Sequence, residues 1–218
     1  KAGARAYLAF QGGIDGPVQL GSRSTYVIGS LGGVSGKPVA AGDELPIGEV
    51  SSRTGDGRVV PEALRRLPGS PAEIRVVPGL YNHRITPESE AGFYADTWTV
   101  APEADRMGYR FRGGRKLEFV ERQQPFGAGS DPSNITDACY PYGSIQVPGG
   151  TEPIILHRDA VSGVCYFMIG TVISADMDLI GQLQPNMKAR FVKVDMDAAL
   201  AARADGMARL GKVKEHLG

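Results

Sequence analysis

The sequence predicts a mainly β fold, a barrel or a sandwich with few helices. Its 218 residues include 30 glycines and 15 prolines, about a fifth of the chain, whereas average usage is roughly 7% and 5%. About ten short apolar runs lie between these turn-forming residues, which is typical of many short strands. The length allows one domain, or two small ones, with a substantial core.

The first half of the chain is rich in turns. Short apolar runs bounded by glycine or proline predict strands at Arg5–Phe10, Asp43–Val50, Ile74–Pro78 and Trp98–Ala101. Residues 51–72 are polar and rich in glycine and proline, so we expect an exposed excursion with one helical turn. The segment Pro87–Asp96 opens with a proline and early acidic residues, which predicts a helix start.

The second half is more regular. Apolar runs predict strands at Tyr109–Arg112, Leu117–Val120, Ser144–Val147, Pro153–Leu156, Tyr166–Ser174 and Ala189–Val194. Ser174 is a suitable N-cap for a short helix that runs to Leu183. Apolar residues at helical spacing predict a C-terminal helix from about Asp197 to Leu217. We therefore divide the chain into a domain at 1–195 and a helix at 196–218.

Composition excludes several classes of function. The 24 Lys+Arg residues balance the 24 Asp+Glu residues without a basic cluster, which argues against a nucleic-acid partner. No run approaches 18 apolar residues, so we expect no membrane partner. The two cysteines and three scattered histidines lack ligand spacing, so we expect no metal. So few cysteines also favour a reducing compartment, and we expect the protein to be cytoplasmic.

The glycine-flanked turn at residues 21–26 is the first candidate site. Arg23 brings a guanidinium beside the hydroxyls of Ser24 and Thr25. With the backbone amides near Gly21, these groups can hold a carboxylate, a carbamate or a phosphate. The simpler interpretation is a polar turn whose hydroxyls cap its own backbone.

Two further polar segments precede or follow predicted strands. Asp105 and Arg106 are adjacent, and such a pair can orient one member toward a ligand, although it is more often a surface contact. Residues 127–140 carry Asn134 among several aspartates and serines, without lysine or arginine. Those residues also suit turns that are held by side-chain-to-backbone hydrogen bonds.

The segment GSIQVPGG places Ser144 and Gln146 two residues apart on a predicted strand. Both side chains then point to one face. Because burying uncharged polar groups costs free energy unless they are hydrogen-bonded, the pair suits a pocket that recognises an amide. Cys165 has no evident base partner, so we interpret it as a packing residue.

Taken together, these segments resemble the biotin-dependent carboxyltransferase family, whose members are also described as the second subunit of allophanate hydrolase. The stretches that carry the resemblance are RAYLAFQGGID, GSRSTY, DRMGYR, DPSN with its following D and Y, GSIQVPGGTEPIIL and GTVISADMDLIGQLQP. They occur in the family's order from about Arg5 to Val194. The resemblance implies a cyclophilin-like β-barrel and a homologous subunit-1 domain as the partner that completes the active site.

The resemblance also implies a reaction. In the urea carboxylase (urea amidolyase) branch, a biotin carboxylase domain uses ATP to carboxylate biotin, and the carboxyltransferase moves CO2 to a urea nitrogen. The chain has no Met-Lys-Met, so biotin arrives in trans on a carrier domain, and ATP is used elsewhere in the complex. A small urea-like or amide-like molecule is then the substrate.

On this hypothesis, each candidate residue has a role. Arg23, Ser24 and Thr25 anchor the carboxylate or the biotin ureido group. Ser144 and Gln146 contact the amide, and Asp105 is the base or orienting acid with Arg106 as its charge partner. Tyr109, which ends the DRMGY stretch, and Asn134 complete the set of binding residues.

Two alternatives stay open at this stage. One is the C subunit of an ATP-dependent 5-oxoprolinase, which opens a lactam without biotin. The other is a non-catalytic regulatory module of the sporulation-kinase inhibitor type. Relatives usually carry several dozen residues before the RAYLAF stretch, so we expect this sequence to be a fragment. Where they have G-G-Y, this chain has Val164-Cys165-Tyr166.

Overall fold

The computed structural model describes residues 3–50, 57–161 and 163–218. By their internal contacts the residues form two compact units. The smaller is Ala6–Val59, and the larger combines Lys1–Arg5 with Val60–Gly218. We describe each unit by itself, and the predicted division after residue 195 stays a prediction.

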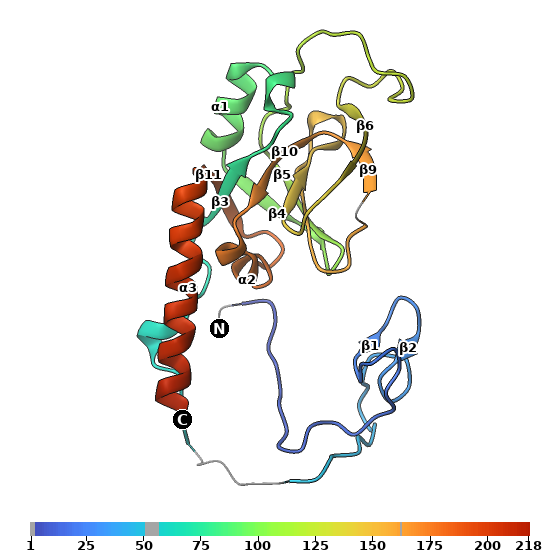
Figure 1. Ribbon diagram of the computed structural model, residues 1–218, viewed down its shortest axis with the longest axis vertical. Helices are drawn as coiled ribbons and strands as arrows, with labels where there is room; N and C mark the ends of the chain where they lie inside the picture. The colour runs from blue at the N-terminus through green and yellow to red at the C-terminus, as the bar shows by residue number, and fades with distance from the viewer. Residues whose placement is uncertain (1–2, 51–56, 162) are drawn as a thin grey trace. The chain divides into compact units, whose positions relative to one another are not determined.

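A closed barrel forms the body of the larger unit (Figure 1). Its strands are β3 (Ala72–Pro78), β4 (Trp98–Ala104), β5 (Gly108–Arg112), β7 (Ser144–Gln146), β8 (Ile154–Leu156), β10 (Met168–Val172) and β11 (Lys188–Lys193). Around the barrel they follow the order β10-β3-β11-β4-β5-β8-β7. The β3–β11 pair is parallel, and the other pairs are antiparallel. The predicted mainly β barrel is confirmed.

The barrel interior is filled by alternate residues of its strands. In β3, Ala72, Ile74 and Val76 are buried, while Glu73 is exposed and Arg75 is half-buried. The same alternation places a set of large side chains in one cluster: Val100, Phe111, Ile145, Ile155, Ile169 and Phe191. Each such side chain stabilises the fold by roughly 1.5–3 kcal/mol through burial.

Helix α1 (Pro87–Ala95) packs against β11 and joins the same cluster (Figure 1). Its start follows the predicted signals, because Pro87 occupies the first turn and the Thr86 side chain accepts a hydrogen bond from the Ser89 amide at 3.2 Å. Phe93 then stacks on Phe191 with ring centroids 4.6 Å apart. The Phe93 carbonyl accepts a 3.1 Å hydrogen bond from the Trp98 indole.

A second, two-stranded sheet lies across one side of the barrel (Figure 1). It consists of β6 (Asn134–Cys139) and β9 (Gly163–Tyr166), neither of which the sequence patterns separated from loop. Ile135, Tyr140 and Leu156 form a separate buried cluster with Ile154 and Met168 beside it. Because the neighbouring residue Ile155 belongs to the main core, this cluster covers the outer face of the barrel strands.

Of the two helices predicted after β10, the first is shorter than expected and the second is confirmed. The helix expected from Ser174 to Leu183 is a 3₁₀ turn, η4 (Ser174–Asp176), followed by a single α-helical turn, α2 (Met177–Ile180). The predicted C-terminal helix is confirmed as α3 (Met196–Leu217), and the Asp195 side chain caps it by accepting from the Ala198 amide at 2.8 Å. Among the described helices, none is long and apolar enough to span a bilayer.

Three predicted strands are wrong. Arg5–Phe10 is not a strand in the structure, and Tyr7 and Leu8 in it are exposed because no neighbouring strand pairs with the segment. Asp43–Val50 makes one bridge, from Ile47 to Ile14. Leu117–Val120 also makes one bridge, at Phe119. The expected helical turn in residues 51–72 is η1 (Glu62–Leu64), and residues 51–56 lie outside the described part.

The smaller unit contains a short hairpin, β1 (Thr25–Tyr26) with β2 (Leu31–Gly32). Gly32 has a φ of 73°, and a Cβ there would lie 2.3 Å from the Ser24 carbonyl oxygen. This close approach of two backbones requires glycine.

Candidate functional site

Two of the polar segments noted in the sequence meet at one pocket of the larger unit. The pocket has a volume of about 540 Å³. One wall is the loop Ser130–Pro132, a second is Gly149 of the GSIQVPGG segment, and the third is the chain after β5, residues 116–119. Residues that are separated along the sequence therefore surround one space.

Ser133 fastens the loop to the glycine turn. Its side chain is fully buried, and its Oγ accepts a 3.0 Å hydrogen bond from the Gly149 amide. Its own amide donates to Asp131 Oδ1 at 2.8 Å, and its carbonyl accepts from the Phe167 amide at 2.8 Å. These bonds fix the position of the Asp131 carboxylate at the pocket wall.

The glycine turn, Gly149-Gly150, has positive φ angles, which cost free energy in a residue that carries a Cβ. Gly149 and Gly150 have φ values of 61° and 75°. A Cβ on Gly150 would lie 2.8 Å from the Leu117 carbonyl oxygen, while the Leu117 amide donates to the Gly150 carbonyl at 2.7 Å. The turn thus packs directly against the third wall of the pocket.

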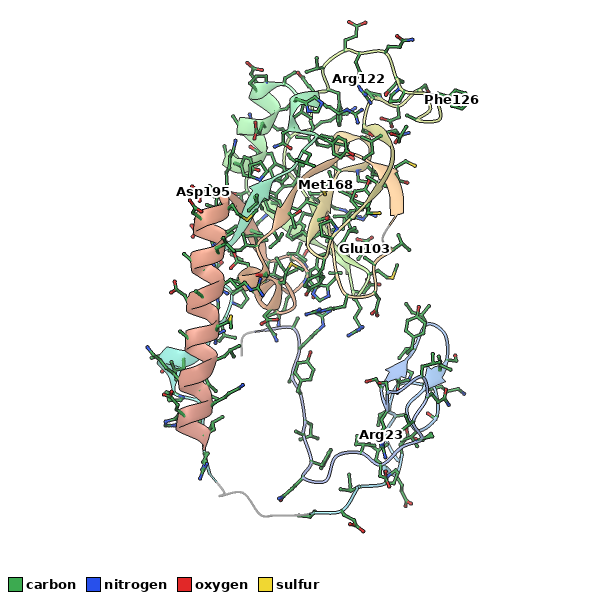
Figure 2. The ribbon with its side chains drawn as sticks, in the orientation of Figure 1. Arg23, Glu103, Arg122, Phe126, Met168 and Asp195 are labelled. Atoms are coloured by element: carbon green, nitrogen blue, oxygen red, sulfur yellow. The ribbon has the colours of Figure 1, made fainter. Side chains whose placement is uncertain are left out.

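Two arginines hold the loop at residues 130–134 through its backbone carbonyls. Arg84 is 5% exposed, and its Nη2 donates to the carbonyls of Asn134 at 2.8 Å and Pro132 at 3.3 Å. Among the described residues, no carboxylate pairs with it. Arg122, which Figure 2 shows with Phe126 on the long segment between β5 and β6, also donates to the Asn134 carbonyl. Cationic side chains therefore back the loop.

Charged groups of both signs face the pocket. The pKa of Asp131 is lowered by its hydrogen bonds to the Ser133 side chain and amide, and further by the nearby Lys116 charge. Asp131 is therefore a carboxylate at neutral pH. Lys116, Glu118 and Asp131 are all exposed and line the pocket. The arrangement offers a cationic donor and anionic acceptors to one small ligand.

Comparison with known proteins identifies the family. Residues 1–193 match the family described as "Carboxyltransferase domain, subdomain A and B". The chain belongs to this carboxyltransferase family. It is 32% identical over 203 residues to the C subunit of 5-oxoprolinase from Escherichia coli (strain K12), covering 93% of this chain and 60% of that protein.

Relatives of a second kind are multidomain proteins. Urea amidolyase of Lachancea kluyveri is 30% identical over 236 residues, covering 94% of this chain and 12% of that protein. The crystal structure of the K. lactis urea amidolyase superposes with a TM-score of 0.82 at 28% identity, covering 97% of this chain and 13% of that one. The carboxyltransferase chain thus spans about 60% of the 5-oxoprolinase relative and a small part of the larger ones.

The carboxyltransferase fold places Ser144 and Gln146 on one face of β7, as the spacing predicts, but not at the pocket. Both are buried on the side covered by β6 and β9, where Gln146 pairs with Ile154 and Met168. The Ser144 hydroxyl donates to the Pro141 carbonyl at 2.7 Å. Gln146 Nε2 is buried without a described partner. Their role in binding stays a prediction.

Asp105, Arg106 and Tyr109 lie at the start of β5, whereas Lys116 follows its end. Asp105 Oδ1 accepts from the amides of Met107 at 2.7 Å and Gly108 at 3.2 Å, which shapes the β4–β5 turn. Arg106 forms a two-bond ion pair with Asp159 at 2.7 and 2.9 Å.

Tyr109 is 1% exposed, and its hydroxyl accepts from Arg5. The turn that contains Asp105 and Arg106 is exposed. The predicted roles of these three residues stay predictions.

Arg23, Ser24 and Thr25 lie in the smaller unit. Arg23 pairs with Asp15 at 3.0 Å, and both side chains are more than half exposed. The Ser24 amide donates to the Ser22 hydroxyl at 3.0 Å, which is the self-capped turn considered from the sequence. Whether they also bind a ligand stays a prediction.

Sequence reasoning missed Lys116 altogether. It lies two residues after a glycine pair that follows a strand, and no spacing linked it to Asp131. Asn134 was selected for its polar side chain, but in the structure its carbonyl is the group that the arginines bind. Among the described residues, no group of three or more histidine, cysteine or acidic side chains is placed to hold a metal.

Proposed function

We propose that this chain contributes to a carboxyl-transfer site, where CO2 passes from carboxybiotin to a nitrogen of urea or a urea-like amide. The family match over residues 1–193 supports carboxyl transfer as the class of reaction. The superposition on the K. lactis urea amidolyase and urea carboxylase supports the urea branch. The observation that carries the proposal is the joining of two family segments at one pocket that holds Lys116 and Asp131.

The donor set of the pocket fits the ureido group. Urea and the ring of biotin each present a carbonyl, which needs donors, beside N–H groups, which need acceptors. Lys116 supplies a donor for the carbonyl, while Asp131 and Glu118 supply acceptors for the N–H groups. When bound, carboxybiotin supplies the carboxyl group itself.

The residues of the chain then position the substrate and polarise its carbonyl group. Lys116 stabilises negative charge that develops on a ureido oxygen, and one such oriented donor lowers a barrier by about 3–4 kcal/mol where the partner domain excludes water from the site. Asp131, locked by Ser133, accepts a hydrogen bond from a substrate N–H and thereby orients its nitrogen. Its lowered pKa makes it a weak base, so it orients the substrate rather than removing the proton. Asp105, the base expected from the sequence, lies at the other end of β5 from Lys116 and outside this pocket, so its role as the base stays a separate prediction.

The proposal includes partners, because one relative is named as a subunit of 5-oxoprolinase and the other, urea amidolyase, is a much longer protein that this chain covers to 12%. A homologous subunit-1 domain completes the site, a biotin carboxylase uses ATP, and a carrier domain delivers biotin in trans. The complex works in the cytoplasm.

The test measures transfer directly. The protein, reconstituted with a partner domain, receives ¹⁴C-carboxybiotin and urea, and labelled N-carboxyurea is quantified. We expect urea-dependent transfer that falls about 10²–10³-fold in Lys116→Met, since one oriented donor is lost. Lys212→Met, an exposed lysine on α3, is the matched control and should retain the rate. Absence of transfer, or equal rates in the two variants, contradicts the proposal.

The sequence identity of 32% to the C subunit of 5-oxoprolinase favours a second candidate, ATP-dependent opening of 5-oxoproline. In that case the same preparation, supplied with ATP and its partner subunits, releases glutamate from 5-oxoproline and leaves carboxybiotin unchanged. Running both assays on one preparation decides between the two reactions.

A further inference from the structure

Helix α3 turns its largest apolar side chains away from its own barrel. It packs against η4, β3 and η1, and the less exposed residues along it include Ala199, Ala202, Gly206 and Val213. The large side chains lie elsewhere on the helix, and each of them is more than half exposed: Met196, Leu200, Met207 and Leu210. In a surface helix the broad apolar stripe normally faces the core of its own domain. In α3 the smaller residues face the protein and the larger ones face solvent.

The exposed apolar residues belong to one row with heptad spacing. Successive members of the row are alternately four and three residues apart, which keeps them on one side of a helix. We call this set the α3 row: Met196, Leu200, Arg203, Met207, Leu210, Lys214 and Leu217. Such spacing is typical of the seam along which two helices pack together. The α3 row is therefore suited to a second helix.

The N-terminal part of the α3 row borders an apolar groove. The groove has a volume of about 390 Å³ and lies between α3 and the strands β3 and β10. Its walls include Met196 and Leu200 from the row, together with Leu80 and Met168. Leu80 is mostly exposed there. The groove thus offers apolar surface to side chains that enter from another helix.

The C-terminal part of α3 extends past the barrel. In Figure 1 the helix runs along one side of the barrel and continues beyond it. On this part Arg209 donates to the Leu64 carbonyl at 3.0 Å, so η1 supports the helix from one side. Met207 and Leu210 lie on the same part with their side chains exposed. Each chain therefore has an apolar groove beside one end of α3 and exposed apolar residues toward the other end.

The α3 row matches a reversed copy of itself. In an antiparallel pair centred on residue 205, Leu200 of one copy meets Leu210 of the other. Met207 meets Arg203, whose aliphatic stem covers it while the guanidinium reaches water. Leu210 and Met207 of one copy then lie over the groove of the other, because Leu200 and Arg203 line that groove.

Charge selects the antiparallel direction. Lys214 belongs to the α3 row, and Asp197 lies beside its first member. An antiparallel pair brings Lys214 of each copy close to Asp197 of the other, which gives two pairs of opposite charge. A parallel pair would instead place Arg203 against Arg203 and Lys214 against Lys214, and like charges across an interface cost free energy.

We propose that α3 is a dimerisation helix, through which two copies of this chain pair antiparallel along the α3 row. The part of each helix that carries Met207 and Leu210 packs over the groove of the other copy. The inference goes beyond the proposed function, because the groove and the row share no residue with the Lys116 pocket.

The first experiment is sedimentation equilibrium of the full chain over a range of protein concentrations. We expect a dimer, and we expect Leu200→Glu to raise its dissociation constant about 100-fold or more, because each dimer loses two buried leucines. Ala208→Glu places the same charge at an exposed position of α3 outside the row, and it should dimerise like the unaltered chain. The fluorescence of the buried Trp98 reports that each variant is folded.

Two outcomes of sedimentation overturn the proposal. A chain that stays monomeric at every concentration leaves the α3 row to a different partner. Equal dissociation constants in Leu200→Glu and Ala208→Glu place the dimer interface elsewhere.

Disulfide cross-linking tests the direction of the pair. The exposed Cys139 and Cys165 are first replaced by serine. Chains with Leu200→Cys are then mixed with longer, tagged chains that carry Leu210→Cys, and the mixture is oxidised. We expect cross-linked dimers that contain one chain of each kind. Leu200→Cys alone should not cross-link, because two such residues lie about 15 Å apart in the antiparallel pair. Efficient cross-linking between two Leu200→Cys chains indicates a parallel pair and overturns the proposal.

Discussion

Replacing Asp176 with asparagine tests how the barrel is tied to the segments around it. Asp176 is fully buried in η4, and it accepts from the Arg75 amide at 2.9 Å and from the Arg75 guanidinium at 2.7 and 3.0 Å. Arg66 donates to the same carboxylate. One side chain therefore joins β3, η4 and the segment after η1.

The expected loss of unfolding free energy follows from the burial of Asp176. Removing one partner of a buried ion pair costs about 3–5 kcal/mol, because the remaining charge is left without compensation. The side chains of Arg66 and Arg75 are about one-third exposed, at 33% and 34%. Water therefore solvates part of the charge that is left unpaired, which makes the loss of stability smaller. We expect Asp176→Asn to lower the free energy of unfolding by about 2–4 kcal/mol.

The pH dependence provides a second signature. Burial alone raises the pKa of Asp176, but hydrogen bonds from Arg75 and Arg66 outweigh it and lower the pKa below its usual value. A lowered pKa means that the stabilisation is present above the unfolded-state value of about 3.9 and is lost as pH falls through the folded-state value. Asp176→Asn should lack this acid-dependent part.

The assay is guanidinium chloride unfolding followed by Trp98, the single tryptophan, which is fully buried. Asp159→Asn is the control, since its partner Arg106 is 66% exposed and such pairs contribute under about 1 kcal/mol. If Asp176→Asn unfolds within about 0.5 kcal/mol of the unaltered chain, the reasoning about this buried carboxylate is refuted.

Two further predictions concern the candidate sites. Gly150→Ala should destabilise the fold by about 2–3 kcal/mol in the same unfolding assay, because its φ is 75° and its Cβ meets the Leu117 carbonyl at 2.8 Å. Gly149→Ala, with φ 61° and no atom within 4 Å, should cost only about 1 kcal/mol, and equal losses would contradict the steric argument. If Arg23 binds a carboxylate, Arg23→Ala should slow carboxyl transfer about 30–1000-fold without changing the thermal unfolding temperature, and Arg23→Lys should not restore the rate. Full activity in both variants would limit Arg23 to its surface ion pair with Asp15.

The fold was predictable where local pattern and tertiary pairing agree. Ile74–Pro78 and Ala189–Val194 are short, mostly apolar runs with an arginine at the second position, and both are barrel strands in the structure. Leu117–Val120 has the same local character, but its first amide is bonded to the Gly150 carbonyl instead of to a strand. Strand formation there depends on a neighbour that the segment itself does not encode.

The candidate site was predictable only in part. Residues 127–140 and the GSIQVPGG segment drew attention by their composition, and both reach the pocket. Their meeting depends on Ser133 bonding the Gly149 amide, a contact that no local pattern contains. Lys116 joins them because β5 ends nearby, and a lysine in the turn Gly-Gly-Arg-Lys carries no signal of its own.

Barrel closure has a consequence for synthesis of the chain. Strand β3, at residues 72–78, pairs on one side with β10 and on the other with β11, which ends at Lys193. As the ribosome extends the chain, β3 therefore emerges long before either of its neighbours exists. Its paired edges stay open until nearly the whole barrel sequence has been made. Chaperone dependence should consequently be greatest for nascent chains that are arrested between residues 79 and 168.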